Sequence, residues 1–344
     1  MPSNIQSDVL LTPYNTFGIA ARAKRFARVE SVDALRALCE LPEWRDGRRL
    51  IVGGGSNVLF TKDFDGLVVH LATKGHEDLG DDGHDRLIAV AAGESWDGFV
   101  RTSLRAGWPG LENLALIPGS VGAAPVQNIG AYGLELAERF AWLDALDPVA
   151  GASLRMDAEA CAFGYRDSIF KNGLRDRAII TRVVFRLPLR WEPRLTYADL
   201  VERLARNAIV TPSADQIADL VTIIRREKLP DPAVVGNAGS FFKNPLVDAK
   251  TCATLREQAP GLVAHPQADG RFKLAAGWLI DRCGWRGRSL VGSSGRAAVH
   301  ERHALVLVNR GGATGAEVLA LADAIRESVA GRFGVNLEPE PLIV

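Results

Sequence analysis

A serine in a flexible setting is the first candidate for chemistry in this chain. Ser240 lies within Gly236–Pro245, GNAGSFFKNP, after a run of small residues and before two aromatic residues. Glycine permits backbone shapes that bulkier residues avoid and lets a ligand approach the main chain closely. A hydroxyl on such a turn can therefore meet a substrate with little steric cover. An ordinary tight turn between two elements is the alternative for this stretch taken alone.

Two charged residues in unusual surroundings are the next candidates. Arg166 lies in Phe163–Lys171, FGYRDSIFK, where it forms a polar island between aromatic residues. An arginine held by Asp167 could bind a carboxylate through two parallel hydrogen bonds. Glu340 stands between two prolines in an apolar segment, where a carboxylate is costly unless it is partnered. The alternatives are a surface ion pair for Arg166 and an edge strand with solvated acids for Glu340.

Two loops of small residues could bind a phosphate group. Gly53–Asn57, GGGSN, follows the apolar residues Leu50–Val52, and its backbone N–H groups could point into one concavity. It has neither the Walker A pattern nor the dinucleotide fingerprint. Ile117–Gly133, IPGSVGAAPVQNIGAYG, is longer, and Gln127 and Asn128 supply amide donors and acceptors. Together the loops could hold a pyrophosphate and an adjoining ring, with a pair of crowded turns as the alternative.

The composition is that of an ordinary soluble protein. The chain has 344 residues, 47% of them hydrophobic and 24% charged, which is enough for two or three domains. With 41 basic and 41 acidic residues, no nucleic-acid partner is expected. The N-terminus lacks the pattern of a secretory signal and no apolar run is long enough to span a bilayer, so we predict a cytoplasmic protein without a membrane partner. Scattered cysteines and histidines predict no metal site.

The elements that must position these residues indicate an α+β fold. Strands are predicted at Arg25–Val29, Arg49–Val52, Gly66–Leu71, Arg86–Ala92, Phe140–Leu146, Ala178–Leu187, Ala304–Asn309 and Val335–Ile343. Helices are predicted at Ser31–Glu40, Trp96–Ala106, Tyr197–Ala205, Ala214–Lys228, Lys250–Gln258, Leu274–Cys283 and Ala316–Phe333. Because proline cannot continue a helix, the prolines after Lys228 predict a domain boundary there.

In this order, the motifs make the chain similar to the UDP-N-acetylenolpyruvoylglucosamine reductases, flavoenzymes of bacterial peptidoglycan precursor synthesis. The resemblance runs nearly end to end. It rests on NTFG at Asn15–Gly18, GGGSN at Gly53–Asn57, the loop Ile117–Gly133, FGYRDSIFK at Phe163–Lys171, KLPDP at Lys228–Pro232, GNAGSFFKNP at Gly236–Pro245 and LEPE at Leu337–Glu340. The segment Leu195–Tyr197 resembles the subtype with an extra tyrosine loop that covers the substrate.

The resemblance implies an α+β fold with a two-subdomain FAD-binding unit of the vanillyl-alcohol-oxidase (PCMH) type and a C-terminal α+β substrate-binding domain. The expected divisions are 1–66, 67–228 and 229–344, with the final strand returning toward the flavin site. FAD is expected to bind non-covalently, since neither loop holds a histidine or cysteine to be flavinylated. The expected cofactor contacts are Gly53, Gly54, Gly55, Ser56, Asn57, Gly119, Ser120, Gly122, Gln127 and Asn128.

The resemblance also implies a reaction in two halves. NADPH gives hydride to FAD and leaves, and UDP-N-acetylglucosamine enolpyruvate then enters the same site. Hydride passes from flavin N5 to C3 of the enolpyruvyl group, and Ser240, aided by neighbours such as Lys243, gives a proton to C2 to form UDP-N-acetylmuramate. Arg166 is expected to stabilise the charge that spreads into the substrate carboxylate, and Glu340 to polarise this end of the substrate.

The expected substrate contacts are Tyr132, Tyr197, Lys228 and Asn244, with Lys228 facing phosphate. Two other classes stay open at this point. One is another oxidoreductase on the same flavin fold, such as a carbohydrate oxidase that uses oxygen, and the other is a non-catalytic nucleotide-binding or scaffold protein. The sequence leaves the oligomeric state open, and a monomer is the working expectation.

Overall fold

The computed structural model describes residues 5–45 and 47–344, and their contacts divide the chain into two compact units. The first unit holds the described residues among positions 1–9, 23–55 and 64–227. The second holds residues 10–22, 56–63 and 228–344. The chain therefore passes between the units several times, and the predicted three-part division with its break at residue 66 stays a prediction.

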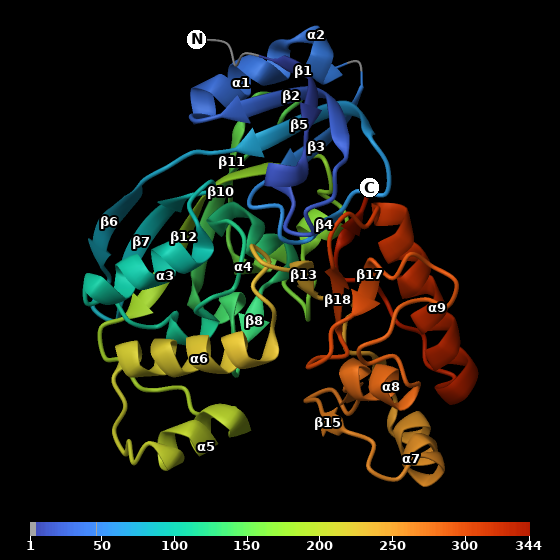
Figure 1. Ribbon diagram of the computed structural model, residues 1–344. Coiled ribbons are helices and arrows are strands. Elements are labelled where there is room, and N and C mark those ends of the chain that lie inside the picture. The colour runs from blue at the N-terminus through green and yellow to red at the C-terminus, as the bar shows by residue number, and fades with distance from the viewer. Residues whose placement is uncertain (1–4, 46) are drawn as a thin grey trace. The chain divides into compact units, whose positions relative to one another are not determined.

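A four-stranded sheet begins the first unit. Its order is β1-β2-β5-β3, and β5 pairs in parallel with both β2 and β3. The strands are β1 (Gln6–Leu10), β2 (Arg22–Val29), β3 (Arg48–Val52) and β5 (Phe64–Leu71). Helices α1 (Val32–Glu40) and α2 (Pro42–Arg45) lie beside this sheet (Figure 1). Ser31 caps α1 by accepting a hydrogen bond from the Ala34 N–H, and Leu35, Leu38 and Trp44 are buried against the strands.

A five-stranded antiparallel sheet forms the larger part of the first unit, in the order β11-β10-β12-β7-β6. Its strands are β6 (His76–Asp81), β7 (Asp85–Ala91), β10 (Phe140–Leu146), β11 (Ser153–Met156) and β12 (Ile179–Pro188). Helix α3 (Trp96–Arg105) buries Trp96 and Phe99 against Phe185 of β12, with ring centroids 5.7 and 5.4 Å apart. Burial of each such ring contributes about 1.5–3 kcal/mol, so this aromatic cluster anchors α3 to the sheet.

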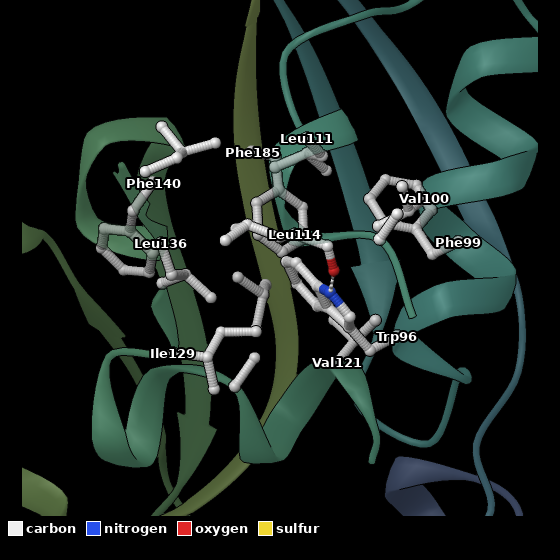
Figure 2. Packing of buried hydrophobic residues seen from close by; sticks show 14 of the residues in the cluster. Trp96, Phe99, Val100, Leu111, Leu114, Val121, Ile129, Leu136, Phe140 and Phe185 are labelled. Atoms are coloured by element: carbon white, nitrogen blue, oxygen red, sulfur yellow. Dashed lines mark hydrogen bonds between the residues drawn. The ribbon is translucent and has the colours of Figure 1, made fainter. Parts of the chain in front are cut away.

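The indole of Trp96 also fixes the chain that follows α3. Its Nε1–H donates to the carbonyl of Leu114 at 2.9 Å inside the core, as the dashed line in Figure 2 shows. The short elements of the first unit are the 3₁₀ turns Glu112–Leu114, Val121–Ala123, Pro125–Gln127, Leu136–Arg139 and Ile169–Lys171, the strands β8 (Gly130–Ala131) and β9 (Leu134–Glu135), and the helices α4 (Ala158–Cys161), α5 (Ala198–Arg206) and α6 (Ala214–Lys228).

The second unit contains small sheets and three helices. The sheets have the orders β13-β18-β17, β14-β16-β15 and β19-β4. Their strands are β4 (Val58–Leu59), β13 (Gly236–Ser240), β14 (Leu246–Val247), β15 (Ala264–Pro266), β16 (Phe272–Leu274), β17 (Ala297–Val299), β18 (Val306–Asn309) and β19 (Leu342–Ile343). The helices are α7 (Ala249–Gln258), α8 (Ala276–Arg282) and α9 (Gly315–Phe333), and the 3₁₀ turn Thr12–Tyr14 also belongs here.

Helix α9 covers the sheet formed by β17 and β18 (Figure 1). Its start is fixed by a capping box, in which Thr314 accepts from the Glu317 N–H and Glu317 accepts from the Thr314 N–H. Gly334 ends the helix in the left-handed region, with φ 66°. The first residue, Gly315, lies so close to the chain that a Cβ there would be 1.7 Å from the carbonyl oxygen of Phe60.

Most of the predicted long elements are confirmed, and two differences have physical reasons. The predicted final strand Val335–Ile343 is wrong in length, since only Leu342–Ile343 pairs with a neighbour. Pro339 and Pro341 lack the N–H that a longer ladder requires. Strand β6 was not predicted, because its residues, HEDLGD, are mostly polar and all exposed and the strand forms an edge.

A histidine is enclosed in the turn between β17 and β18. The Nδ1 of His303 accepts from the Leu305 N–H at 3.3 Å, which requires this nitrogen to be unprotonated. Burial lowers the pKa of His303 to about 4, and the nearby charges of Lys228 and Arg286 and the neighbouring His300 act in the same direction. The folded chain therefore holds this imidazole neutral at pH values at which an exposed histidine is charged.

Alanine substitutions at the two ends of α9 should have opposite effects. We expect Gly315→Ala to lower the free energy of unfolding by about 1–3 kcal/mol or more, because the added Cβ collides with the backbone of Phe60. Gly331→Ala is the matched control, since nothing lies within 4 Å of its Cβ position. It should raise the free energy of unfolding by about 0.5–1 kcal/mol. Denaturant unfolding of both variants tests this, and equal effects would contradict the close packing at Gly315.

His303 should make the folded state less stable as the pH falls from 6.5 toward 4. In this range the unfolded chain binds a proton at His303 and the folded chain does not, so protonation favours unfolding. The His303→Asn variant retains an acceptor for the Leu305 N–H and should lose less stability over the same range. The two proteins should differ in this loss by at most about 3 kcal/mol, since each pKa unit corresponds to about 1.4 kcal/mol. Exposed His265, changed to Asn, is the control, and identical pH profiles for all three proteins would refute the prediction.

Candidate active site

The backbone joins Glu340 directly to the residue after Ser240. The N–H of Glu340 donates to the carbonyl of Phe241 at 2.8 Å, and Phe242 and Pro339 form the adjoining bridge. One further step along, the Lys243 N–H donates to the carbonyl of Glu338 at 3.0 Å. Both Ser240 and Glu340 are half-buried. The backbone segments of two residues that are 100 positions apart in the sequence therefore lie side by side in the second unit.

Ser240 stands at an irregular end of strand β13. The strand pairs with β18, where Ser240 is opposite Val306, and the register shifts between Asn237 and Ser240. Gly239 provides the necessary turn, with φ 70°, a conformation that favours glycine. The buried Asn237 side chain accepts from the Gly239 N–H at 2.9 Å and donates to the carbonyls of Pro230 and Val235. These bonds fix the direction in which the strand presents the serine.

Asn57 holds the other side of Glu340. Its Nδ2 group donates to the Glu340 carbonyl at 3.3 Å, and its own carbonyl accepts from the Leu342 N–H at 2.9 Å. The parallel pairing of β19 with β4 continues this contact. The end of the first glycine loop is therefore attached to the glutamate segment, and both polar backbone atoms of Glu340 are engaged.

Lys243 and Asn244 follow Ser240 with defined partners. The Nζ of Lys243 lies 3.2 Å from a carboxylate oxygen of Glu338. The Oδ1 of Asn244 accepts from the N–H of Ala276 at 3.0 Å, at the first residue of α8. Because its oxygen is engaged, the Nδ2 group is the part of Asn244 that suits contact with a substrate oxygen.

The two glycine loops predicted separately from the sequence meet in the first unit. A Cβ on Gly53 would be 2.0 Å from the Ser120 hydroxyl, and a Cβ on Gly54 would be 2.9 Å from the Cα of Gly119. A Cβ on Gly122 would be 2.5 Å from that of Ala92. The two loops therefore approach each other at Gly53 and Gly54 at distances that only glycine permits.

Asn128 links the second loop to the turn that carries Arg166. It is buried, with φ 43°, and its Nδ2 group donates to Glu135 and to the carbonyl of Gly164. Gly164 and Asp167 close a turn in which Arg166 has φ 54°. The Arg166 guanidinium donates to the Gly130 carbonyl at 2.6 Å and lies over the Tyr165 ring. Arg166 is therefore fixed to the second glycine loop by its own side chain.

Two predicted substrate residues form an aromatic pair. The rings of Tyr132 and Tyr197 are edge to face, with centroids 4.8 Å apart. Tyr132 is buried, with φ 49°, and burial raises the pKa of its hydroxyl to about 12. Tyr197 is 41% exposed at the start of α5, so it can contact a ligand while Tyr132 supports it.

Sequence reasoning missed two polar residues near this pair. Asn113 is fully buried, and its Nδ2 group donates to the carbonyls of Tyr132 at 2.8 Å and Arg194 at 3.0 Å, which ties the two tyrosine segments together. Arg225 of α6 lies within electrostatic reach of Tyr132 and Arg166, and burial lowers the pKa of its guanidinium. Neither residue stands in a recognisable motif, and only the folded chain reveals them.

The structure brings some of the predicted site residues together within each unit. Ser240, Glu340, Asn57 and Asn244 belong to the second unit, and Lys228 is also there, near His303. Arg166, Tyr132, Tyr197 and the second glycine loop belong to the first. The roles of all these residues stay predictions. Among the described residues, no three histidine, cysteine or acidic side chains gather as metal ligands, and no helix has the length and apolar character to cross a membrane.

Two family models match the chain. One described as FAD binding domain matches residues 23–155, and one described as UDP-N-acetylenolpyruvoylglucosamine reductase, C-terminal domain, matches residues 231–344. These matches confirm the predicted α+β fold class, in which an FAD-binding unit precedes a C-terminal domain of the reductase type.

Known relatives cover almost the whole chain. The UDP-N-acetylenolpyruvoylglucosamine reductase of Burkholderia mallei (strain NCTC 10229) is 55% identical over 337 residues, which is 97% of this chain and 96% of the relative. That of Paraburkholderia phymatum is 54% identical over 338 residues, or 98% and 96% of the two chains. The solved structure of the reductase from Thermus caldophilus has a TM-score of 0.68 at 26% identity and covers 99% of both chains. The chain therefore belongs to the UDP-N-acetylenolpyruvoylglucosamine reductase family, FAD-dependent oxidoreductases of peptidoglycan precursor synthesis.

Proposed function

We propose that this protein uses NADPH to reduce UDP-N-acetylglucosamine enolpyruvate to UDP-N-acetylmuramate. The observation that carries the proposal is the hydrogen bond from the Glu340 N–H to the carbonyl of Phe241. It holds a carboxyl-bearing residue beside the segment of the only serine in the GNAGSFFKNP motif. A hydroxyl and a carboxyl group carried by adjoining backbone segments are suited to acting at one end of a substrate, where one of them can transfer a proton.

The residues present fit FAD. Gly53, Gly54 and Gly119 have no side chains and lie where the two loops approach closely, so their main chain is proposed to meet the pyrophosphate. Bound FAD supplies the redox chemistry, in which hydride from NADPH reaches C3 of the enolpyruvyl group. Gly55, Ser56, Asn57, Gly122, Gln127 and Asn128 are proposed as further contacts or supports of the cofactor. Binding is proposed to be non-covalent.

Ser240 is proposed as the proton donor to C2 of the substrate. Addition of hydride at C3 leaves negative charge at C2, and a strongly basic carbon can take a proton from a weakly acidic hydroxyl. Gly239 and Asn237 present the serine on a fixed irregular strand end, so little reorganisation is needed at the moment of transfer. Lys243, three residues further along, adds positive charge on the same segment, although it also pairs with Glu338.

Arg166 and Glu340 are proposed to stabilise the negative charge that develops on the substrate. Delocalisation carries charge from C2 into the substrate carboxylate, and a guanidinium binds a carboxylate through parallel hydrogen bonds. The bond to Gly130 and the contact with Tyr165 hold Arg166 in one orientation before the substrate arrives. Glu340 is proposed to polarise the same end of the substrate as a hydrogen-bond partner.

The remaining predicted residues are proposed to hold the UDP-sugar. Lys228 suits a phosphate group, and Asn244 has a donor group directed by its bond to α8. The half-exposed ring of Tyr197, supported by Tyr132, is proposed to cover the substrate, as in the subtype with an extra tyrosine loop. We propose a cytoplasmic enzyme, because its nucleotide substrates belong to that compartment.

Alanine at Gly54 should weaken FAD binding. The added Cβ would meet the Gly119 backbone at 2.9 Å and push the loops apart. A misfit of this kind costs about 1–3 kcal/mol, so the Kd for FAD should rise by about five- to 150-fold. Gly47→Ala is the control, because nothing lies within 4 Å of its Cβ position. Titration of the apoprotein with FAD, followed by flavin fluorescence, measures both, and an unchanged Kd in a folded Gly54→Ala protein would contradict the role of the loop.

Ser240→Ala should separate the two halves of the reaction. NADPH should bleach the bound flavin at the wild-type rate under anaerobic conditions. Recovery of the yellow colour on addition of UDP-N-acetylglucosamine enolpyruvate should be slower by about 10²–10⁴-fold, because the proton donor is missing. Stopped-flow absorbance at the flavin band measures each half. Ser240→Cys retains an ionisable proton, so its rate of flavin reoxidation should lie between those of wild type and Ser240→Ala. Exposed Ser293, changed to Ala, should behave as wild type.

Two outcomes would contradict the proposed function. Loss of flavin reduction in a folded, FAD-loaded Ser240→Ala protein would remove the assigned role of the serine. A wild-type protein that stays reduced with this substrate but is rapidly reoxidised by oxygen, with a carbohydrate alcohol as reductant, would instead be an oxidase on the same fold.

A further inference from the structure

Leu116 has a backbone conformation that its side chain disfavours. Its φ is 58°, in the left-handed region where residues with a Cβ are strained. It comes one residue before the second glycine loop, Ile117–Gly133, and two residues after Leu114, whose carbonyl Trp96 holds. The direction in which the loop leaves the core is therefore set at Leu116.

Charged side chains from two helices hold both polar backbone atoms of Leu116. Its N–H donates to Oδ1 of Asp97, in the first turn of α3, at 2.5 Å. Its carbonyl accepts from Nε of Arg225, in α6, at 3.3 Å. All three residues lie in the first unit. Leu116 is thus held on both sides of its Cα, through the N–H of one peptide group and the C=O of the next, so a change in its φ and ψ disturbs these bonds.

The chain around Asp97 also grips the loop further along. The Trp96 N–H donates to the Gly119 carbonyl at 3.0 Å, and the Val121 N–H donates to the Glu94 carbonyl at 2.9 Å. The Gly122 N–H donates to the Ala92 carbonyl at 2.8 Å. These three bonds join backbone atoms only. The bonds at Leu116 differ, because they depend on two particular side chains.

The surroundings of Arg225 explain why a charged residue is tolerated there. Burial lowers the pKa of the Arg225 guanidinium, the Tyr132 hydroxyl and the Asp97 carboxylate favour its charge, and Arg166 opposes it. Its bond to the Leu116 carbonyl satisfies one donor in an otherwise costly partly buried position. Asp97 and Arg225 are thus opposite charges that bind the two peptide groups on either side of the Leu116 Cα.

We propose that Asp97 and Arg225 are positioning residues that hold Leu116 in its left-handed conformation and so set the path of Ile117–Gly122 for FAD. The inference rests on the proposed function only in assigning FAD to this loop. Neither side chain needs to touch the cofactor. Their contribution is to keep the loop in its binding shape in the absence of ligand, which lowers the cost of ordering it on binding.

A glycine at position 116 provides the test, because glycine adopts φ near 58° without the strain of a Cβ. We expect Asp97→Ala to raise the Kd for FAD about tenfold, which corresponds to about 1.4 kcal/mol. Adding Leu116→Gly should recover at least about threefold of that loss. Leu116→Gly alone should change the Kd by less than about threefold, and Asp97→Asn, which keeps the acceptor oxygen, should stay within about twofold of wild type.

Ala208→Gly is the matched control for the rescue. Ala208 also has a left-handed backbone, with φ 54°, and it is exposed in the same unit. Its change to glycine should leave the Kd of Asp97→Ala protein as it was. If Ala208→Gly restores binding as well as Leu116→Gly does, or if Asp97→Ala and Leu116→Gly are simply additive, the proposal is overturned.

Hydrogen exchange of the apoprotein supplies a second readout that does not depend on turnover. Peptides covering residues 111–122 should exchange faster in Asp97→Ala than in wild type. Should Asp97→Ala fail to fold, Arg225→Met is tested in the same way. If Leu116→Gly then fails to improve the FAD affinity of the Arg225→Met protein, Arg225 acts by direct contact with FAD and not by positioning the loop. Because both readouts precede the reaction, the inference can hold even where the proposed substrate is wrong, and can fail where it is right.

Discussion

Two hydrogen bonds to its backbone set the position of Glu340, and the account of the second unit's site depends on them. Its N–H is bound to the carbonyl of Phe241 and its carbonyl to Nδ2 of Asn57. A proline on each side limits the backbone further. Three motifs from the beginning, the last third and the end of the chain are thereby joined at one point. A side chain held in this way has few directions open to it, which is the condition for preorganised electrostatic stabilisation.

In the first unit, the main constraint is the close approach of the two glycine loops, Gly53–Asn57 and Ile117–Gly133. Their main-chain groups are proposed to bind the cofactor. Glycine at positions 53, 54 and 119 allows the approach, and the core beneath it keeps the loops in place. Trp96 connects the core with the second loop, since its ring packs on Phe185 and its indole N–H donates to the Leu114 carbonyl (Figure 2). The aromatic core of the sheet is therefore linked mechanically to the loop assigned to the cofactor.

The long helices and strands could be predicted from the sequence where apolar residues recur at regular spacing. Helix α6 and strand β10 have the bounds expected from their apolar spacing, because packing and periodicity agree there. The family resemblance implied a shared site for Ser240 and Glu340, and that role stays a prediction. The edge strand β6 could not be predicted from its polar residues, since its hydrogen bonds to β7 leave no mark in the hydrophobic pattern.

The residues that support the site were the least predictable. Leu116 carries no sign of its left-handed backbone, because turn chemistry is read from glycine, asparagine and aspartate. Asn113 and Arg225 act through carbonyl groups of other segments, and such partners are defined only by the fold. Sequence patterns thus reveal groups that meet the ligand more readily than groups that hold the protein in shape.

A crystal structure of this chain with FAD and UDP-N-acetylglucosamine enolpyruvate would test the central claim most directly. The quantity to measure is the distance from Oγ of Ser240 to C2 of the enolpyruvyl group, with Glu340 at the same end of the substrate. The account predicts roughly 3–3.5 Å, the separation of reacting atoms in a productive complex. A serine hydroxyl that faces away from the enolpyruvyl group, with another proton donor at C2, would contradict it.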